Sequence, residues 1–306
     1  MAAVYEGFEK FEVQTTDPEV KIVGRRAGKG PPLLLLHGNP LAHRSWHNVA
    51  PRLAQDFTVV VADLRGYGES SKPRGKPDHS NYSFRRMAQD HVDVMAHFGY
   101  PRFSVAGHDR GGRTAHRMAA DHPDKIVKAA FVDIAPTPVV WGEMSNMDVT
   151  LSLYHWTFMA QPVGFPERLL AGNEAFYIRG KLTTQGLGKG GFSEEEIQHY
   201  ISLCTPEHIH GVCEDYRAGA TIDLQTDLAD LKAGRKVQCP VMLLWGERSH
   251  VAHHPRGAVE VWRDYCENIA RARALPCGHY PSEQAPDETY RELRDFFTSS
   301  FSPARP

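Results

Sequence analysis

The sequence has few cysteines and no long hydrophobic run. Its five cysteines, at positions 204, 213, 239, 266 and 277, are odd in number and irregularly spaced, which is typical of reduced thiols and not of a disulfide framework. The longest wholly aliphatic run, Leu33 to Leu36, is far shorter than the ~18 apolar residues of a membrane span. The N-terminal segment mixes charged with apolar side chains and lacks the apolar region of a secretory signal. We therefore expect a cytoplasmic protein without a membrane segment.

The chain also lacks an excess of charge of either sign. Its 306 residues include 35 Lys and Arg against 37 Asp and Glu, a formal net charge of −2, and the two signs are mixed throughout. Because there is no basic stripe, neither a nucleic acid nor a membrane surface is an expected partner. The hydrophobic fraction of 41% is that of an ordinary globular protein. This length can hold two average domains, or one large α/β domain with an insertion, around a core that needs no disulfide or metal.

Five short apolar segments have the length and composition of strands buried in a parallel sheet. They are residues 33–36, 58–62, 103–106, 129–132 and 241–245. Helix-like segments, such as Phe84 to Phe98 and Arg113 to His122, lie between them. This alternation predicts an α/β fold, with a mostly parallel sheet and helices on both of its faces.

The alternation stops between about residues 137 and 236. This stretch contains several helical patterns but no comparable strand pattern, and it includes a glycine-rich loop at 186–191. The loop lacks the Gly-Lys-Ser/Thr ending of a phosphate-binding loop, so we expect no nucleotide there. We interpret residues 137–236 as a helical cap inserted into an α/β core that comprises residues 1–136 and 237–306.

A sharp turn with an acidic residue at its centre follows the strand predicted at 103–106. Its sequence is Gly-His-Asp-Arg-Gly at 107–111, and a helical pattern comes next. Small residues on either side of Asp109 are typical of the nucleophile elbow of the α/β-hydrolase fold, which projects its central side chain beyond the carboxyl end of the sheet. The motif predicts an α/β-hydrolase fold in which Asp109 is the nucleophile.

Two further segments have the positions that this fold requires. His-Gly-Asn-Pro at 37–40 directly follows an early strand, so the backbone amides of Asn39 and Arg110 are the expected oxyanion hole. His279 follows the last predicted strand, where the fold places its base. A carboxylate nucleophile is already ionised at neutral pH and attacks saturated or strained carbon, forming an ester that a histidine-activated water can hydrolyse. Asp109 therefore favours a dehalogenase or an epoxide hydrolase over an esterase.

The sequence resembles the fluoroacetate (haloacetate) dehalogenases over nearly its whole length. The segments that carry the resemblance are Ala-Gly-His-Asp-Arg-Gly-Gly-Arg at 106–113, Val-Asp-Ile-Ala-Pro-Thr at 132–137, Tyr-His-Trp at 154–156 and Cys-Glu-Asp-Tyr-Arg-Ala-Gly at 213–219. The resemblance implies hydrolysis of small anionic haloacetates to glycolate and halide by way of an aspartyl ester. It also implies that the enzyme is a homodimer, and we expect neither a cofactor nor a metal.

The resemblance also implies roles for individual side chains. Arg110 and Arg113 lie three residues apart on one helix face, where two guanidinium groups would attract an anionic substrate, and by resemblance both hold its carboxylate. His155, Trp156 and Tyr216 match the halide pocket of the family, and each can present an N–H or O–H donor.

The acid that orients His279 has two candidates. Asp133 ends the strand at 129–132 and matches the acid of the family, whereas Glu247 follows the strand at 241–245 and is the weaker candidate. We favour Asp133, which would hold the tautomer of His279 and stabilise its cation.

One position departs from the family pattern. Asn39 stands where these enzymes tend to carry Phe, and the resulting His-Gly-Asn-Pro is similar to haloalkane dehalogenases. Its side chain could donate a hydrogen bond near Asp109, or only its backbone amide could matter.

Several alternatives stay open. Epoxide hydrolysis needs cap tyrosines, and Tyr154 and Tyr216 are available. Haloalkane hydrolysis is suggested by Asn39, and a receptor for a small acid without catalytic activity is a third alternative. The group Cys204, His208, His210 and Cys213 does not have the usual spacing of zinc ligands. The pairs His43/His47 and His253/His254 are expected to be mostly solvated.

Overall fold

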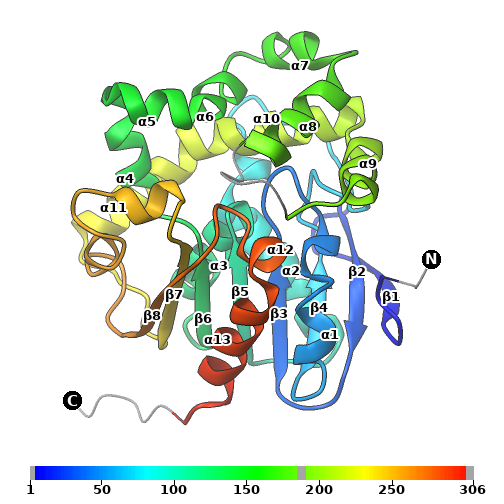
Figure 1. Ribbon diagram of the computed structural model, residues 1–306, viewed down its shortest axis with the longest axis vertical. Coiled ribbons are helices and arrows are strands. Elements are labelled where there is room, and N and C mark those ends of the chain that lie inside the picture. Colours follow the sequence, from blue (N-terminus) through cyan, green and yellow to red (C-terminus); the bar gives the residue numbers. More distant parts are fainter. Residues whose placement is uncertain (1–3, 185–190, 301–306) are drawn as a thin grey trace.

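An eight-stranded sheet forms the centre of the computed structural model, which describes residues 4–184 and 191–300 (Figure 1). Along the sheet the strands follow the order β1-β2-β4-β3-β5-β6-β7-β8. The pairs β1/β2 and β2/β4 are antiparallel, and all the other neighbours are parallel. The bounds are β1 (Glu9–Gln14), β2 (Lys21–Ala27), β3 (Pro32–Leu36), β4 (Thr58–Ala62), β5 (Phe103–His108), β6 (Ile126–Val132), β7 (Val241–Gly246) and β8 (Ile269–Leu275).

The five strands predicted from apolar runs are confirmed as β3 to β7. In β3, Leu33 and Leu35 pack into the core on one face of the sheet, and Leu34 and Leu36 pack into the core on the other face. A strand covered on both faces is apolar throughout, so its sequence is easy to recognise. Strands β1, β2 and β8 are not recognisable in the sequence, because charged residues interrupt them and β1 and β8 are edge strands.

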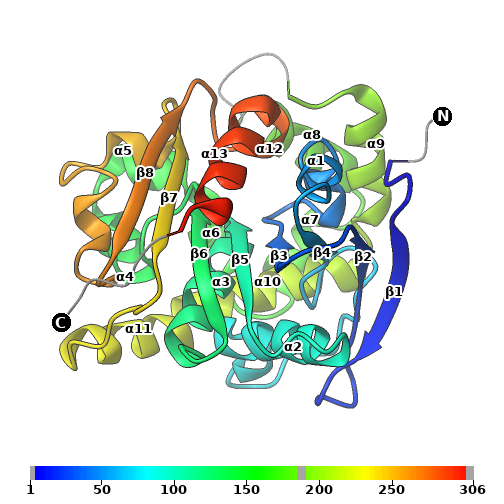
Figure 2. The same cartoon turned by 90° about the horizontal axis from the view of Figure 1, so that it is seen from below.

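Helices cover both faces of the sheet, as the alternation predicted (Figure 2). Helices α2 (Phe84–His97) and α3 (Arg110–Asp121) pack on one face. The other face is covered by η1 (His43–Trp46), α1 (Ala50–Leu53), α12 (Pro281–Gln284) and α13 (Pro286–Thr298). Helix α3 begins three residues earlier than expected, directly after Asp109.

Eight α-helices lie between β6 and β7 in the described part of residues 137–236, where the sequence predicts a cap (Figure 1). They are α4 (Thr137–Gly142), α5 (Met147–Ser152), α6 (Tyr154–Met159), α7 (Phe165–Leu170), α8 (Glu174–Thr184), α9 (Glu194–Leu203), α10 (Pro206–Ala220) and α11 (Ile222–Lys232). Most of them gather at one end of the sheet, and α6 and α10 lie above the carboxyl ends of its central strands. Apart from Gly191, the glycine-rich loop at 186–191 lies outside the described residues.

None of the helices within 4–184 and 191–300 combines the length and the apolar character that crossing a lipid bilayer requires.

Candidate active site

The turn between β5 and α3 holds Asp109 in a strained backbone conformation, with φ 47° and ψ −115°. Its glycines are required by close packing. A Cβ atom on Gly107 would lie 2.1 Å from the backbone oxygen of Gly111, and one on Gly111 would lie 2.4 Å from the backbone oxygen of His37. The structure thus has the strand–turn–helix geometry of a nucleophile elbow, and strain of this kind is typical of functional positions.

Asp109 is nearly buried and is surrounded by groups that stabilise its ionised form. The backbone amide of Asn39 donates a hydrogen bond of 3.0 Å to its Oδ2, and Nε2 of His279 lies 4.0 Å from the same oxygen. Burial alone would raise the pKa of Asp109, but the charges of neighbouring histidines and arginines outweigh it and hold the pKa well below its usual range. Asp109 is therefore a carboxylate at neutral pH.

The acid beside His279 is Asp133, which follows β6. Its Oδ2 lies 2.6 Å from Nδ1 of His279, and its Oδ1 accepts a hydrogen bond of 2.9 Å from the amide of Gly246. Burial would lower the pKa of His279, but the hydrogen bond and the charge of Asp133 raise it above its ordinary value. The other candidate acid, Glu247, is exposed to solvent.

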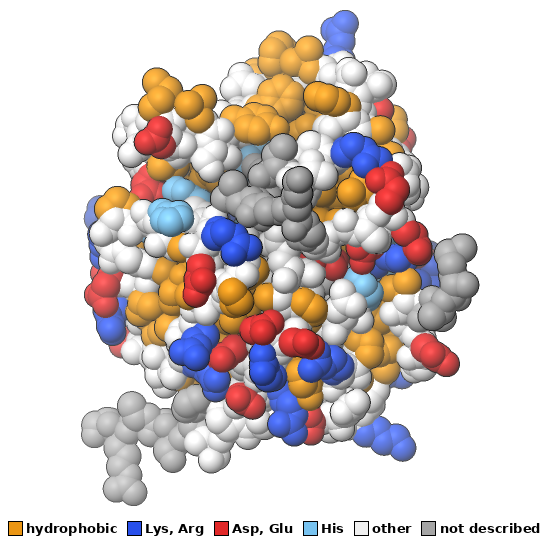
Figure 3. Space-filling model, in the orientation of Figure 1, with side chains coloured by type: hydrophobic (Ala, Val, Ile, Leu, Met, Phe, Trp, Pro, Cys, Tyr) orange, Lys and Arg blue, Asp and Glu red, His pale blue; other side chains and the backbone are white. Residues whose placement is uncertain are grey.

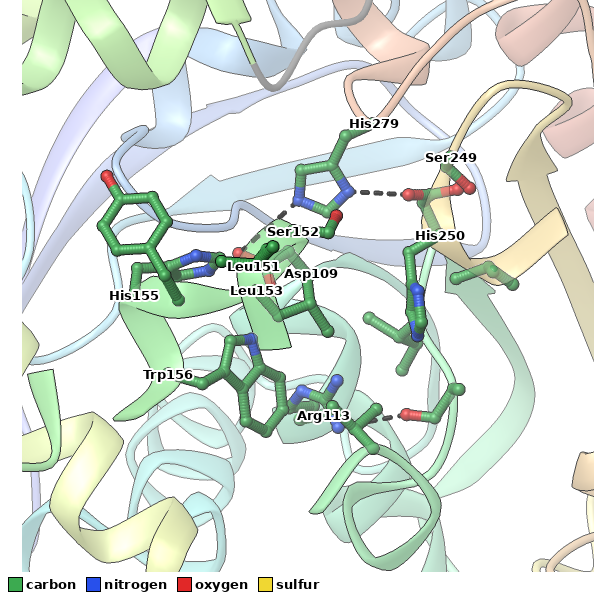
Figure 4. A pocket seen from close by; sticks show the side chains of 16 residues that line it. Asp109, Arg113, Leu151, Ser152, Leu153, His155, Trp156, Ser249, His250 and His279 are labelled. Atoms are coloured by element: carbon green, nitrogen blue, oxygen red, sulfur yellow. Dashed lines mark hydrogen bonds and ion pairs between the residues drawn. The ribbon is translucent and has the colours of Figure 1, made fainter. Parts of the chain in front are cut away.

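A cavity of about 300 Å³ opens above Asp109, between the sheet and the cap (Figure 4). Helix α6 forms one wall, the short 3-10 helix η4 (His250–His253) faces it, and His279 projects from the core side. The residues predicted from the sequence that line the cavity are Asp109, Arg113, Asp133, His155, Trp156 and His279. Asn39, Arg110 and Tyr216 are not among its lining residues.

The two arginines differ in their surroundings. Nε of Arg110, at 2.8 Å, and Nη2 donate hydrogen bonds to the carboxylate of Asp215. Nη1 of Arg110 is buried and has no hydrogen-bonding partner among the described residues. Nη1 of Arg113 donates to the backbone oxygen of Ala135 and to Thr137 Oγ1, both at 3.0 Å, and its Nε is buried without a described partner. Burial and the charge of Arg110 lower the pKa of Arg113 to about 10, so both side chains are cations at neutral pH.

The three aromatic residues predicted to bind halide lie together. The ring of Tyr216 meets those of His155 and Trp156 edge to face, at centroid distances of 5.7 and 5.9 Å. Burial and the charge of Lys181 lower the pKa of His155 well below 6.5, so its imidazole is neutral. The Tyr216 hydroxyl accepts a hydrogen bond of 3.4 Å from the side-chain amide of Asn39, so its own proton is available for donation.

Sequence reasoning missed Lys181. It lies on the buried side of α8 with Ile178 and Leu182, and it is only 3% exposed. Burial, opposed by the charge of Asp109, lowers its pKa to about 7. Its charge in turn lowers the pKa values of His155 and His279. No sequence signal could have singled it out, because a lysine in a helix is ordinarily solvated.

Two other expectations about histidines can be compared with the structure. His43 and His254 are buried, so the prediction that these histidines are mostly solvated was wrong for them, because His43, in η1, packs beside Asp63 and His254 packs beside Glu143. In the Cys204-to-Cys213 group, His210 and Cys213 have separate partners, the Gly75 amide and the Met159 sulfur.

Comparisons with known proteins agree with this geometry. Residues 31–286 match the model of the alpha/beta hydrolase fold family. The chain is 44% identical to a fluoroacetate dehalogenase from Burkholderia sp. over 302 residues, covering 98% of this chain and 97% of that protein. It is 34% identical to a soluble epoxide hydrolase from Corynebacterium sp., covering 89% of this chain and 91% of that protein.

Solved structures of other proteins also have a fold similar to that of this chain. A Nostoc protein, provisionally described as an α/β hydrolase, superposes with a TM-score of 0.91 at 44% identity, covering 96% of this chain and 99% of that one. The epoxide hydrolase CorEH superposes with a TM-score of 0.84 at 30% identity, covering 95% and 98%. The chain therefore belongs to the α/β-hydrolase superfamily and, within it, to the fluoroacetate (haloacetate) dehalogenase family.

Proposed function

We propose that this enzyme hydrolyses haloacetates, such as fluoroacetate and chloroacetate, to glycolate and halide. An oxygen of Asp109 attacks the α-carbon, a carbon–oxygen bond forms, and halide leaves with the electron pair of the carbon–halogen bond. Water then adds to the ester carbonyl of Asp109 and gives a proton to His279. Glycolate departs, the carboxylate is restored, and the net products are glycolate, halide and one proton. No described residue donates a hydrogen bond to Oδ1 of Asp109, so this oxygen is free to attack.

The observation that carries the proposal is a cation in the wall of the cavity that holds the nucleophile. Arg113 lines that cavity, and its Nε is a buried donor with no described partner. The substrate carboxylate would supply the missing acceptor there, and Nη1 of Arg110 is a second buried donor of the same kind. A neutral substrate would leave these donors unpaired, which is unfavourable in a buried site.

Donors for the departing halide support the same reaction. Fluoride leaves carbon only when strong hydrogen bonds stabilise it, and the neutral imidazole of His155, the indole of Trp156 and the hydroxyl of Tyr216 offer three. Tyr216 lies beside the other two but does not line the cavity. We therefore propose that it acts from behind them, or enters the pocket when substrate binds.

For ester hydrolysis we propose His279 as general base, oriented by Asp133. The backbone amide of Asn39 already donates a hydrogen bond to Asp109 Oδ2. It would keep this hydrogen bond when Oδ2 becomes the ester carbonyl oxygen and then the oxyanion. The amide of Arg110, at the start of α3, would be the second donor.

The test combines halide release with isotope labelling. Ion chromatography should detect fluoride and chloride from the two haloacetates with the native enzyme and not with Asp109→Asn, under conditions that exclude deamidation. In a single turnover in H₂¹⁸O, the label should enter Asp109 and be absent from glycolate. Label in glycolate after one turnover would refute the aspartyl ester.

Two alternatives have specific support. Epoxide hydrolases are among the relatives, and Tyr154 lines the cavity. Haloalkane hydrolysis is favoured by the side chain of Asn39, which reaches Tyr216. Turnover of a neutral epoxide or haloalkane at a higher kcat/KM than that of chloroacetate would favour one of these over our proposal.

We also propose that the protein is a cytoplasmic homodimer whose interface lies on the cap. Large apolar side chains are exposed on the cap, and Figure 3 shows hydrophobic surface gathered over that end of the molecule. They include Met147, Leu151, Val163, Phe165, Leu169 and Phe176. A patch of this kind is typical of protein interfaces. Light scattering after gel filtration should give a dimer, which Phe176→Asp weakens and Val127→Asp, on the core strand β6, does not. The proposed cytoplasmic location has separate support. All five cysteines are unpaired, as expected for a protein in a reducing compartment.

A further inference from the structure

A second polar cluster lies away from the catalytic cavity, where the cap meets the core. His47 follows η1, Glu283 belongs to α12, and Glu196 belongs to α9 of the cap. One potential ligand atom from each residue lies within 4.8 Å of the others. None of the three lines the catalytic cavity.

Glu283 is the most deeply buried member of the cluster. Its side chain is 0% exposed, and neither carboxylate oxygen has a hydrogen-bonding partner among the described residues. Its Oε2 lies 3.9 Å from Nδ1 of His47. The hydroxyl of Tyr200, on the same cap helix as Glu196, is also buried and interacts with Glu283. Burial and the charge of Glu196 outweigh that interaction and raise the pKa of Glu283 well above its usual range. A buried carboxylate without a compensating charge is strongly unfavourable, so Glu283 either keeps a proton or exchanges it for a cation. Glu196 and His47 are close enough to complete the ligand set of such a cation.

His47 is oriented as metal-binding histidines are. Its Nδ1 lies 2.9 Å from the backbone oxygen of Arg44, which can only accept, so Nδ1 carries the proton. In the neutral imidazole the lone pair is then on Nε2, which lies 3.2 Å from Oε1 of Glu196. Two acceptors at that distance repel each other unless a proton or a metal ion lies between them. Ligand atoms at 2.0–2.2 Å around tetrahedral zinc are about 3.3–3.6 Å apart, close to the 3.2 Å between Nε2 of His47 and Oε1 of Glu196.

We infer that His47, Glu196 and Glu283 form a site for one divalent transition-metal ion, best matched by Zn²⁺. One imidazole and two carboxylates are a mixed nitrogen and oxygen set, which suits Zn²⁺ better than Ca²⁺ or Mg²⁺. The two carboxylates would carry two negative charges, and the nearby cation Arg44 is already paired with Glu195, at 3.3 Å from its Nη2. The cluster therefore has negative charge to offer a metal ion. The bound ion would connect cap helix α9 to α12, the segment that directly follows the catalytic His279. Its role would be to hold cap and core together, and it takes no part in the chemistry.

The test is zinc binding by the full-length protein after removal of metal. Calorimetry should give one Zn²⁺ per chain, with Ca²⁺ binding at least about tenfold more weakly, and Zn²⁺ should raise the melting temperature by a few degrees. Glu283→Gln, Glu196→Gln and His47→Gln should each weaken Zn²⁺ binding by at least about tenfold. His199→Gln, which removes a neighbouring histidine of α9 outside the cluster, should bind as the native chain does.

Two results would overturn the inference. The first is no stoichiometric Zn²⁺ binding at neutral pH, which would mean that Glu283 is protonated and that His47 and Glu196 form a plain ion pair. The second is Zn²⁺ binding that survives each of the three ligand substitutions, which would place the metal on surface histidines. Because three separate substitutions are tested, a variant that fails to fold does not decide the question.

Discussion

The pair formed by Asp133 and His279 leads to a prediction that separates the two chemical steps. Asp133→Asn keeps the shape of the side chain and removes its charge. In the proposed mechanism, formation of the ester needs only Asp109, whereas hydrolysis needs His279 as a base held in the correct tautomer. We expect the variant to release one halide per active site quickly and then to stall as the ester.

The size of the effect follows from the hydrogen bond. Nδ1 of His279 and Oδ2 of Asp133 are 2.6 Å apart, and Asp133 is buried. A charge-assisted hydrogen bond of this kind contributes about 1.5–3 kcal/mol, which corresponds to a hydrolysis rate lowered about 10–150-fold. Asp133 also raises the pKa of His279, so the acidic limb of the remaining hydrolysis should move to lower pH in the variant.

Rapid quenching with chloroacetate measures both steps, and mass spectrometry detects the ester on Asp109. The matched control is Glu247→Gln, which removes the other candidate acid and should leave the kinetics unchanged because Glu247 is exposed. Equal slowing of ester formation and hydrolysis by Asp133→Asn, or a stalled ester in Glu247→Gln, would refute the assignment.

Three further predictions concern other parts of the site. Lys181→Met removes a cation that lowers the pKa of His279, so the acidic limb of kcat should move to higher pH; an unchanged pH profile would contradict this. Arg113→Leu should raise KM for chloroacetate by about 10–100-fold through the loss of charged hydrogen bonds, and equal KM values in steady-state assays would count against carboxylate binding. Gly107→Ala places a Cβ 2.1 Å from a backbone oxygen and should lower the melting temperature sharply or prevent folding. The control is Gly142→Ala, whose added Cβ has no atom within 4 Å. Its melting temperature in thermal denaturation should equal that of the native protein.

The sequence allowed the central part of the fold to be predicted because buried parallel strands are apolar on both faces. The five strands β3 to β7 were found from that property alone. The strands β1, β2 and β8 were missed, since strands interrupted by charged residues resemble loops in composition. The elbow around Asp109 was also predictable, because its glycines and its position after a strand are local properties.

The surroundings of each side chain could not be predicted in the same way. Arg110 and Arg113 look equivalent on one helix face, yet Asp215, from a distant cap helix, holds Arg110 while Arg113 lines the cavity. Lys181 and Glu283 look like solvated charges in the sequence, and both are buried.

By itself, the sequence determined the chemistry that is available. An aspartate at the elbow, with a histidine after the last predicted strand, predicts a covalent ester hydrolysed by an activated water. The tertiary structure decided which acid orients that histidine, which arginine faces the cavity and which charges lose their solvent. The physical reason is distance along the chain. Side chains more than a hundred residues apart, such as Asp133 and His279, come into contact only in the folded protein, and their pKa values depend on those contacts.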